Sequence, residues 1–193
     1  MTKFITMLCL LVIVFKGYSQ ESSFSEMELM NFQLRAQQKA EDFSTYIGII
    51  ASKTTSLYDK EEAIYLACAL FIHDTVTIQV SYCPKNGVSE IVSRTLIDYL
   101  RRLSWLDYDY VTIEWVEFAV IGNLKKGPDG RFHGLISYVQ IFRGTKGDYT
   151  YEDKTMKHIE VVLDLYRKFD EAGEEKWEWD VFLSNINIKE PCL

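Results

Sequence analysis

The sequence predicts an α+β fold, with helices mainly in the first half of the chain and antiparallel strands in the second half. Up to residue 104, apolar residues recur mostly every three or four positions, which is typical of helices that pack one side against a core. From residue 107 onward they alternate with polar residues, which is typical of half-buried strands. We therefore expect three N-terminal helices packed on a curved, mostly antiparallel sheet.

The first nineteen residues have the pattern of a signal peptide. A short basic start precedes an uncharged apolar run over residues 4–15, and the small residues Gly17 and Ser19 precede a predicted cleavage site before Gln20. The run is too short to span a membrane, which takes about 20 apolar residues; a buried helix and an uncleaved anchor are the alternatives. We expect a secreted or periplasmic protein with no stable membrane span after cleavage, a flexible lead-in over residues 20–30 and a single domain over residues 31–190.

Charge and cysteine content limit the class of partner. The chain has a net charge of −7 at neutral pH, and cleavage would also remove Lys3 and Lys16. This balance argues against nucleic acid, whose phosphate backbone requires clustered positive charge. Cleavage would leave Cys68, Cys83 and Cys192. We expect a buried thiol at Cys68 and, if a disulfide exists, a bond between Cys83 and Cys192.

Helical periodicity and one alternating segment occupy the chain before residue 104. A first helix is predicted over residues 32–50 and a second over residues 59–73. Residues 75–82 alternate between apolar and polar side chains, as a half-buried strand does. A third helix is predicted to begin near Ser89, a plausible N-cap, and to end near Leu103.

The longest predicted strand, residues 107–121, contains a change of apolar phase. Val111, Ile113 and Trp115 alternate with polar residues, but the phase slips by one residue after Trp115. Strict alternation would then place Glu117 on the apolar face. A β-bulge that keeps the apolar residues on one face is the better explanation, so we expect Glu117 to point to solvent.

The remaining chain is predicted to return in antiparallel hairpins. Residues 132–143 carry large apolar side chains on both faces, which predicts a central strand and favours a homodimer through the open sheet face. Residues 144–154 are interpreted as a polar loop, and residues 155–169 and 176–183 as the last two strands. The apolar faces of those strands are expected to be formed by Ile159, Val161 and Leu163 and by Trp177, Trp179, Val181 and Leu183.

This order of elements resembles that of the NTF2-like superfamily, the α+β fold of nuclear transport factor 2, ketosteroid isomerases and SnoaL-type cyclases. The resemblance covers residues 32–188 and is sharpest in residues 70–80 (LFIHDTVTIQV) and 176–183 (KWEWDVFL). It implies a cone whose interior, between the helices and the sheet, holds acid, base or hydrogen-bonding groups in the catalytic branches. No such set maps residue by residue onto this sequence, and the fold hosts enzymes, binding modules and scaffolds alike.

Aromatic residues are the candidate ligand-binding groups. Those expected to face the interior could line a hydrophobic cavity, with hydroxyl and indole groups as polar contacts, or simply fill the core. These pocket candidates are Tyr82, Trp115, Tyr138, Trp177 and Trp179. A further group near the start of the long strand and in the predicted loop, Tyr108, Tyr110, Tyr149 and Tyr151, could form a contact patch for a sugar or a protein.

Few residues are candidates for chemistry. The alternative acid or base is Glu117, if the bulge is absent, or His158. The predicted interior faces hold no other group expected to titrate near neutral pH. Because no histidine, cysteine or carboxylate spacing matches a metal motif and no phosphate-binding loop occurs, the sequence predicts neither a metal nor another cofactor.

These observations favour an exported, non-catalytic domain that binds a small apolar ligand or a protein partner, such as an envelope protein. The alternative is a cofactor-independent isomerase, dehydratase or cyclase that acts on an apolar small molecule. A structural envelope component without a ligand is a third possibility. The space between the third helix and the strands separates these hypotheses, because a void there favours ligand binding and tight packing favours an interaction module.

Overall fold

The computed structural model describes residues 24–82, 89–169 and 173–192. This part of the chain contains three helices, α1 (Glu26–Ala51), α2 (Leu57–Cys68) and α3 (Leu96–Ser104), and a mixed seven-stranded sheet. The predicted α+β class and the number of helices are therefore confirmed. No helix in these ranges is long and apolar enough to cross a membrane. The predicted signal peptide, residues 1–19, lies outside the described residues.

The sheet combines one parallel pair with antiparallel pairs. Its strands are β1 (Thr77–Tyr82), β2 (Glu90–Thr95), β3 (Tyr110–Val120), β4 (Lys125–Lys126), β5 (Phe132–Lys146), β6 (Tyr149–Phe169) and β7 (Glu175–Glu190). Their order is β2-β1-β7-β6-β5-β3, with β4 paired to β5. β1 runs parallel to β7, whereas the other described pairs are antiparallel. β5 is paired on both sides, with β3 and β6, as its two-sided apolar sequence predicts, but it lies next to the β3 edge of the sheet rather than at its centre.

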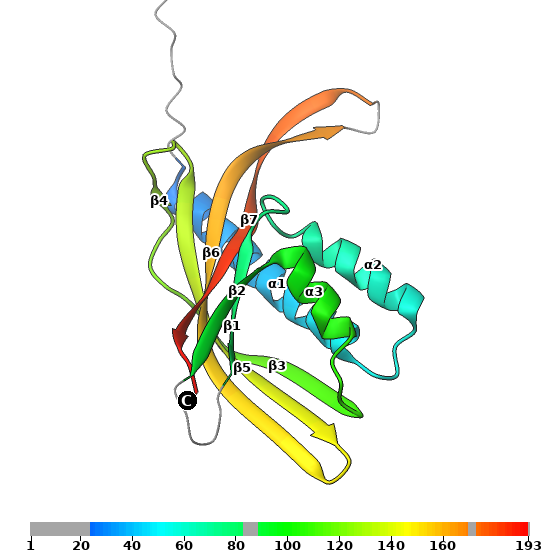
Figure 1. Cartoon of the computed structure of the whole chain (residues 1–193). Coiled ribbons are helices and arrows are strands. Elements are labelled where there is room, and N and C mark those ends of the chain that lie inside the picture. Colours follow the sequence, from blue (N-terminus) through cyan, green and yellow to red (C-terminus); the bar gives the residue numbers. More distant parts are fainter. Residues whose placement is uncertain (1–23, 83–88, 170–172, 193) are drawn as a thin grey trace, which may run out of the picture.

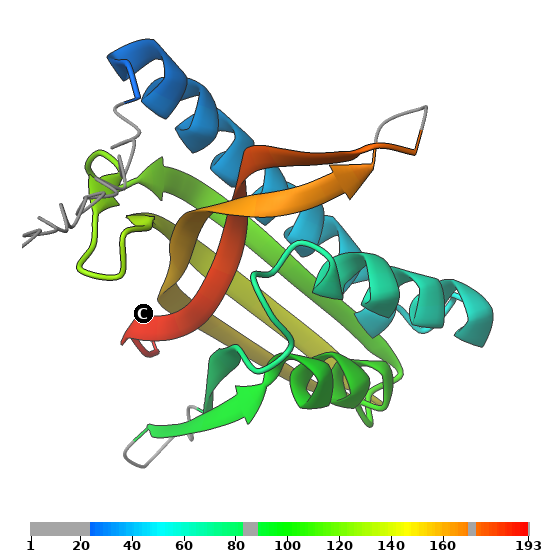
Figure 2. The same cartoon turned by 90° about the horizontal axis from the view of Figure 1, so that it is seen from above.

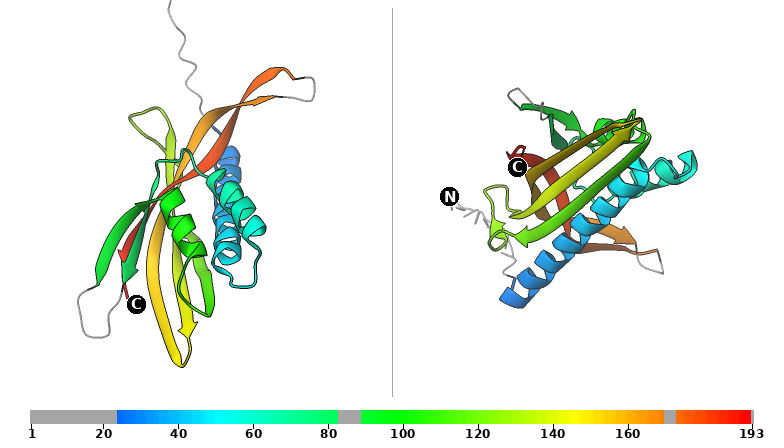
Figure 3. Two further views of the ribbon diagram at one scale, coloured as in Figure 1. Left: turned by 45° about the vertical axis from the view of Figure 1, so that its right-hand side comes forward. Right: turned by 90° about the horizontal axis from the view of Figure 1, so that it is seen from below.

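All three helices lie on one face of the bent sheet, which we call the inner face (Figures 1 and 3). α1 crosses this face diagonally (Figure 2) and contacts β3 and β7. The core lies between the helices and the inner face, and its fully buried side chains include Phe43, Leu100, Ile159 and Leu183. The far ends of β6 and β7 extend beyond the rest of the sheet as an arm (Figure 1).

α1 begins earlier than the sequence pattern predicts. It starts at Glu26, inside the segment that was expected to be a flexible lead-in. Ser25 is the reason, because its hydroxyl accepts a hydrogen bond from the Glu28 backbone N–H while the Glu28 carboxylate accepts from the Ser25 backbone N–H. This capping box satisfies two backbone donors and allows a helix in a polar segment.

Residues 90–95 form strand β2, so the prediction that the third helix begins near Ser89 is wrong. Ile91 and Val92 are β-branched residues, which fit a pleated strand better than a helix, and they pair with Ser81 and Val80 of β1. α3 starts only at Leu96, where the Thr95 hydroxyl accepts a hydrogen bond from the backbone of Asp98. The polar N-cap, rather than the apolar stripe, sets the start of the helix.

The bulge predicted in the long strand is confirmed. The pairing of β3 with β5 shifts register between Val116 and Ala119, and Glu117 has a positive φ of 59° within this step. The side chain of Glu117 is exposed. Ile113 and Trp115 before the bulge are buried on the inner face.

Residues 144–154 are mostly strand, so the predicted polar loop is wrong. β5 continues to Lys146 and β6 starts at Tyr149, and Gly147 adopts a φ of 55° in the tight turn between them. Glycine reaches this left-handed conformation without a steric penalty, and the short turn allows both strands to extend. As a result, Asp153 and Thr155 join the inner side of β6.

The cysteines follow the prediction in part. Cys68 is a free thiol, half-buried rather than fully buried, and burial raises its pKa. Cys192 is disulfide-bonded. Because Cys83 lies outside the described residues, the Cys83–Cys192 pairing stays a prediction.

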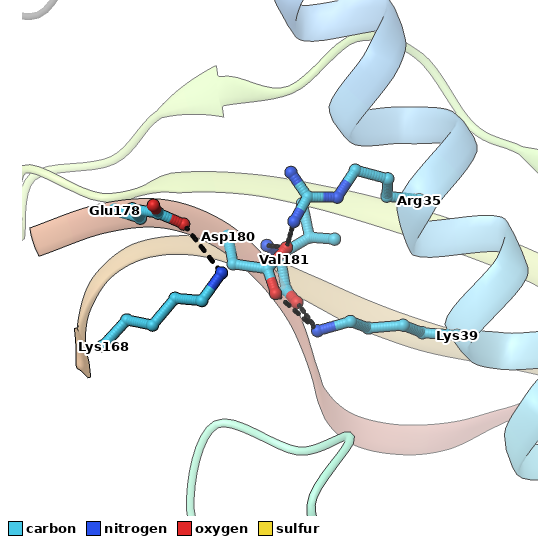
Figure 4. Close-up of polar contacts among 6 residues, drawn as sticks. All are labelled: Arg35, Lys39, Lys168, Glu178, Asp180 and Val181. Carbon is cyan, nitrogen blue, oxygen red and sulfur yellow. Dashed lines mark hydrogen bonds and ion pairs between the residues drawn. The ribbon is translucent and has the colours of Figure 1, made fainter. Parts of the chain in front are cut away.

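Asp180 of β7 connects α1 to the sheet (Figure 4). Its carboxylate contacts the guanidinium of Arg35 and, at 3.0 Å, the ammonium of Lys39, which also donates to the Val181 carbonyl at 2.6 Å. The side chains of Asp180 and Lys39 are 13% and 19% exposed, so their contact is shielded from water more than an ordinary surface ion pair, whereas Arg35 is half exposed. The cluster holds the N-terminal half of α1 against β7.

Replacing Asp180 by asparagine is expected to lower the free energy of unfolding by about 1–2 kcal/mol, because two cations then lose their charged acceptor. Urea denaturation measures this loss. Glu178→Gln is the matched control, since Glu178 lies nearby on β7 and its ion pairs in the described part of the chain are with exposed lysines, at 3.6 and 3.8 Å. Its expected effect is below about 0.5 kcal/mol. Equal effects of the two substitutions would show that the Asp180 cluster does not hold α1.

Candidate functional site

A pocket of about 590 Å³ lies between α3 and the inner face of the sheet. We call it the α3 pocket. Its walls come from the ends of β1 and β2, from α3 and the segment after it, and from β3, β5 and β6. The volume lies in the range of roughly 300–1,000 Å³ that is typical of small-molecule sites. The apolar and aromatic side chains that line it are Val80, Tyr82, Tyr99, Leu103, Trp105, Leu106, Tyr108, Ile113, Phe142 and Tyr151.

Four aromatic rings run along one wall of the α3 pocket. Tyr108 packs edge-on against Phe142 at 5.7 Å between ring centroids, and Phe142 contacts Tyr151 at 5.9 Å. Tyr151 in turn stacks on Tyr82 at 6.3 Å. Gly144 makes the first contact possible, because a Cβ atom at that position would lie 2.7 Å from the Tyr108 ring. We call these four rings the aromatic wall.

Lys157 places an ammonium group in the floor of the pocket. It lies on β6 opposite Tyr138 of β5, and only 1% of its surface is exposed. Its Nζ atom donates to Gln140 Oε1 at 3.2 Å, and no carboxylate of the described chain forms an ion pair with it. Burial lowers the pKa of Lys157 to about 8, against a smaller opposing effect of Asp153.

Asp153 lines the same pocket two positions beyond Thr155 along the inner side of β6. Burial raises the pKa of this carboxyl, and hydrogen bonding by Thr155 and the charge of Lys157 counteract part of that rise. The Thr155 hydroxyl lies 3.3 Å from Asp153 Oδ1 and 3.1 Å from the Ser81 hydroxyl. The pocket therefore contains an amine and a carboxyl group whose pKa values are both displaced toward neutrality.

The α3 side of the pocket carries charge that is largely paired. Asp98 contacts Arg94, at the end of β2, at 3.3 Å and Arg102, one helical turn further along α3, at 3.0 Å. Arg101 also lines the pocket. Such neighbouring pairs add little to stability, but they surround the mouth of the pocket with polar groups.

Of the predicted pocket aromatics, only Tyr82 lines the α3 pocket, at its rim, where its side chain is 58% exposed. Trp115 and Tyr138 stack on each other at 3.9 Å within the core, where Trp115 Nε1 and the Tyr138 hydroxyl have no hydrogen-bond partner among the described residues. Trp177 lies on the exposed arm of β7, and Trp179 packs edge-on against Phe24 at 5.3 Å. These four side chains do not line the α3 pocket, because core filling and strand extension place them elsewhere.

The two predicted acid–base candidates also lie outside the pocket. Glu117 is exposed on the bulge, and the alternation of β6 places His158 on the face opposite Lys157. Burial and the charge of Lys189 lower the pKa of His158. The interior groups that were missed are Lys157 and Asp153, which share the odd-numbered phase of Ile159 and Val161. Extending that phase toward the N-terminus would have found them.

Neither a metal cluster nor a related protein identifies the site. In the described ranges, no three histidine, cysteine or acidic side chains are grouped so that they could hold a metal ion. Comparisons of the chain with protein-family models, with curated proteins and with solved structures give no match. The geometry of the α3 pocket is therefore the basis for assigning a function.

Proposed function

We propose that this protein is a non-catalytic binding module that holds a small, mainly apolar organic molecule in the α3 pocket. The observation that carries the proposal is a cavity of about 590 Å³ between α3 and the sheet, walled by aromatic and aliphatic side chains. A tightly packed interior would have favoured a protein-interaction module instead. The few polar groups at the floor suit the usual design of ligand sites, in which they orient a mainly apolar molecule.

The proposal includes an NTF2-like cone and export to a secreted or periplasmic location. Three helices on the inner face of a bent sheet support the cone, and the signal-peptide pattern of residues 1–19 supports export. The β1–β2 hairpin is an addition to the order of elements on which the resemblance is based. We also propose a homodimer through the outer face, where β5 carries the half-buried Leu135 and Ile141.

Blocking the pocket is expected to abolish binding of an apolar fluorophore. Val80 lines the pocket and is half-buried, so Val80→Trp would fill part of the cavity. We expect saturable binding of a naphthalene-based fluorophore to the unmodified protein and at least a tenfold weaker affinity for this variant. Fluorescence titration gives both dissociation constants.

Ile91→Trp is the matched control for this experiment. Ile91 lies in the neighbouring strand β2, is 48% exposed and does not line the pocket. We expect it to bind the fluorophore as the unmodified protein does. Equal affinity of both variants, or no saturable binding to the unmodified protein, would disprove the proposed function. Circular dichroism and urea midpoints establish that each variant is folded.

A cofactor-independent enzyme is the second candidate, and Asp153 and Lys157 are the observation that favours it. Both line the pocket, and burial shifts the pKa of the carboxyl upward and that of the amine downward. Groups tuned in this way can exchange protons with a bound molecule near neutral pH. Recovery of a bound ligand chemically unchanged after prolonged incubation supports the binding module, whereas an isomerised or dehydrated product supports the enzyme.

A further inference from the structure

We propose that the ligand of the α3 pocket is an amphipathic carboxylic acid, whose carboxylate binds Lys157 and whose apolar body packs on the aromatic wall. This inference rests on the proposed function and names the chemical class of the ligand. The ligand would then lie with its acidic group at the floor of the pocket, beside β5 and β6.

Lys157 has hydrogen-bonding capacity that the described protein leaves unused. An ammonium group carries three donors, whereas its Nζ atom has one acceptor, Gln140 Oε1. Burying a charge with so little compensation is unfavourable. A carboxylate would supply a counter-charge and two strong acceptors, and charge-assisted bonds of this kind are about twice as strong as neutral ones.

Gln140 completes the complementarity to a carboxylate. Because its Oε1 atom accepts from Lys157, its amide Nε2 atom is left as a donor, and it has no acceptor within the described part of the chain. Gln140 and Lys157 both line the pocket. The Lys157 ammonium and the Gln140 amide N–H thus lie side by side on neighbouring strands, and the two oxygens of a carboxylate can accept hydrogen bonds from both.

The charge balance around the pocket is compatible with one more negative charge. Asp153 lies four residues from Lys157 on the same strand, roughly 13 Å between backbone positions. Its charge acts on Lys157, but it opposes only part of the lowering of the Lys157 pKa by burial. Arg94 lines the pocket from β2, and Asp98, Arg101 and Arg102 line it from α3. Asp107, in the segment after α3, is paired with Lys146. Cations therefore outnumber carboxylates among the charged side chains that line the cavity.

The aromatic wall determines the rest of the ligand. Tyr108 before β3, Phe142 on β5 and Tyr151 on β6 form a continuous row of rings, which suits an alkyl chain or an aromatic ring system. Fatty acids and aromatic acids combine such a body with one carboxylate, whereas sugars and nucleotides lack the apolar area.

Calorimetric titration with decanoate and decanamide tests the inference on the unmodified protein. The two probes have the same chain length and differ in the charge of the head group. At pH 7 we expect decanoate to bind at least tenfold more tightly than decanamide. Lys157→Met is expected to remove this preference, and Lys154→Met, which alters an exposed lysine on the opposite side of β6, is expected to keep it.

The pH dependence gives a second readout. A bound carboxylate raises the pKa of Lys157 above its value of about 8 in the unliganded protein. Above pH 8 the amine must therefore take up a proton to bind decanoate, and the affinity falls by up to tenfold per pH unit until the higher pKa of the complex is reached. Measurements from pH 7 to 9 stay below the ordinary titration range of tyrosine. Decanamide affinity is expected to change little.

The failures of the two proposals are distinguishable. If decanoate and decanamide bind with equal affinity and Val80→Trp weakens both, the carboxylate inference is wrong and the pocket still binds an apolar molecule. If neither probe binds and the fluorophore does not bind either, the proposed function itself is wrong. The comparison of the two probes needs no variant, so it holds even if Lys157→Met fails to fold.

Discussion

Replacing Phe43 by alanine is expected to lower the free energy of unfolding by about 3–5 kcal/mol, the usual cost of removing a fully buried phenylalanine. Phe43 is 0% exposed and connects α1 to the sheet. Its ring packs edge-on against Phe71 at 4.8 Å and against Trp115 of β3 at 5.4 Å. Alanine would remove both contacts and leave a cavity where the helix and the sheet meet. Urea denaturation followed by tryptophan fluorescence measures the loss.

Leu34→Ala is the matched control, because Leu34 lies on the same helix with 59% of its surface exposed. Its expected effect is within about 0.5 kcal/mol. A loss below about 1 kcal/mol for Phe43→Ala would mean that the surrounding core relaxes into the cavity, contrary to the close packing seen around this ring.

The apolar pattern was sufficient to predict most of the architecture. A helix that buries one stripe and a strand that buries alternate residues leave periodic signals, and those signals locate α1, β1, β3 and β5. The phase slip after Trp115 also predicts the bulge that turns Glu117 to solvent, because a strand that packs one face on a core must keep its apolar residues in phase.

The pattern failed where polar residues form regular structure. Lys157 and Asp153 are polar residues on the inner face of β6. The apolar alternation of that strand is therefore visible only from Ile159 onward, although the strand itself begins at Tyr149. Ser25 and Thr95 start helices in segments that hydrophobicity alone does not mark. The same polar residues that hide the start of β6 from sequence analysis are those that give the α3 pocket its chemistry.

Replacing Lys157 by methionine is expected to raise the free energy of unfolding at pH 7 by about 3 kcal/mol. The pKa of a lysine is ordinarily 10.5 and is lowered to about 8 here by burial. At pH 7 the folded protein therefore holds a buried charge that the unfolded chain exposes to water. Since each pKa unit corresponds to about 1.4 kcal/mol, the charged form is destabilised in the fold by roughly 3 kcal/mol. Methionine fills a similar volume without that charge.

The stabilisation by methionine must diminish at alkaline pH, which separates a charge effect from a packing effect. Between pH 8 and 10.5 the unfolded chain binds more protons at Lys157 than the folded protein does, so the stability of the unmodified protein rises with pH in this interval. Urea denaturation at pH 7 and pH 10 should therefore show a smaller difference between the Lys157→Met variant and the unmodified protein at the higher pH. Lys154→Met, at an exposed position, should show neither the stabilisation nor its pH dependence. A difference that stays constant with pH would assign the effect to packing, and Lys157 would then not be the titrating group at the floor of the pocket.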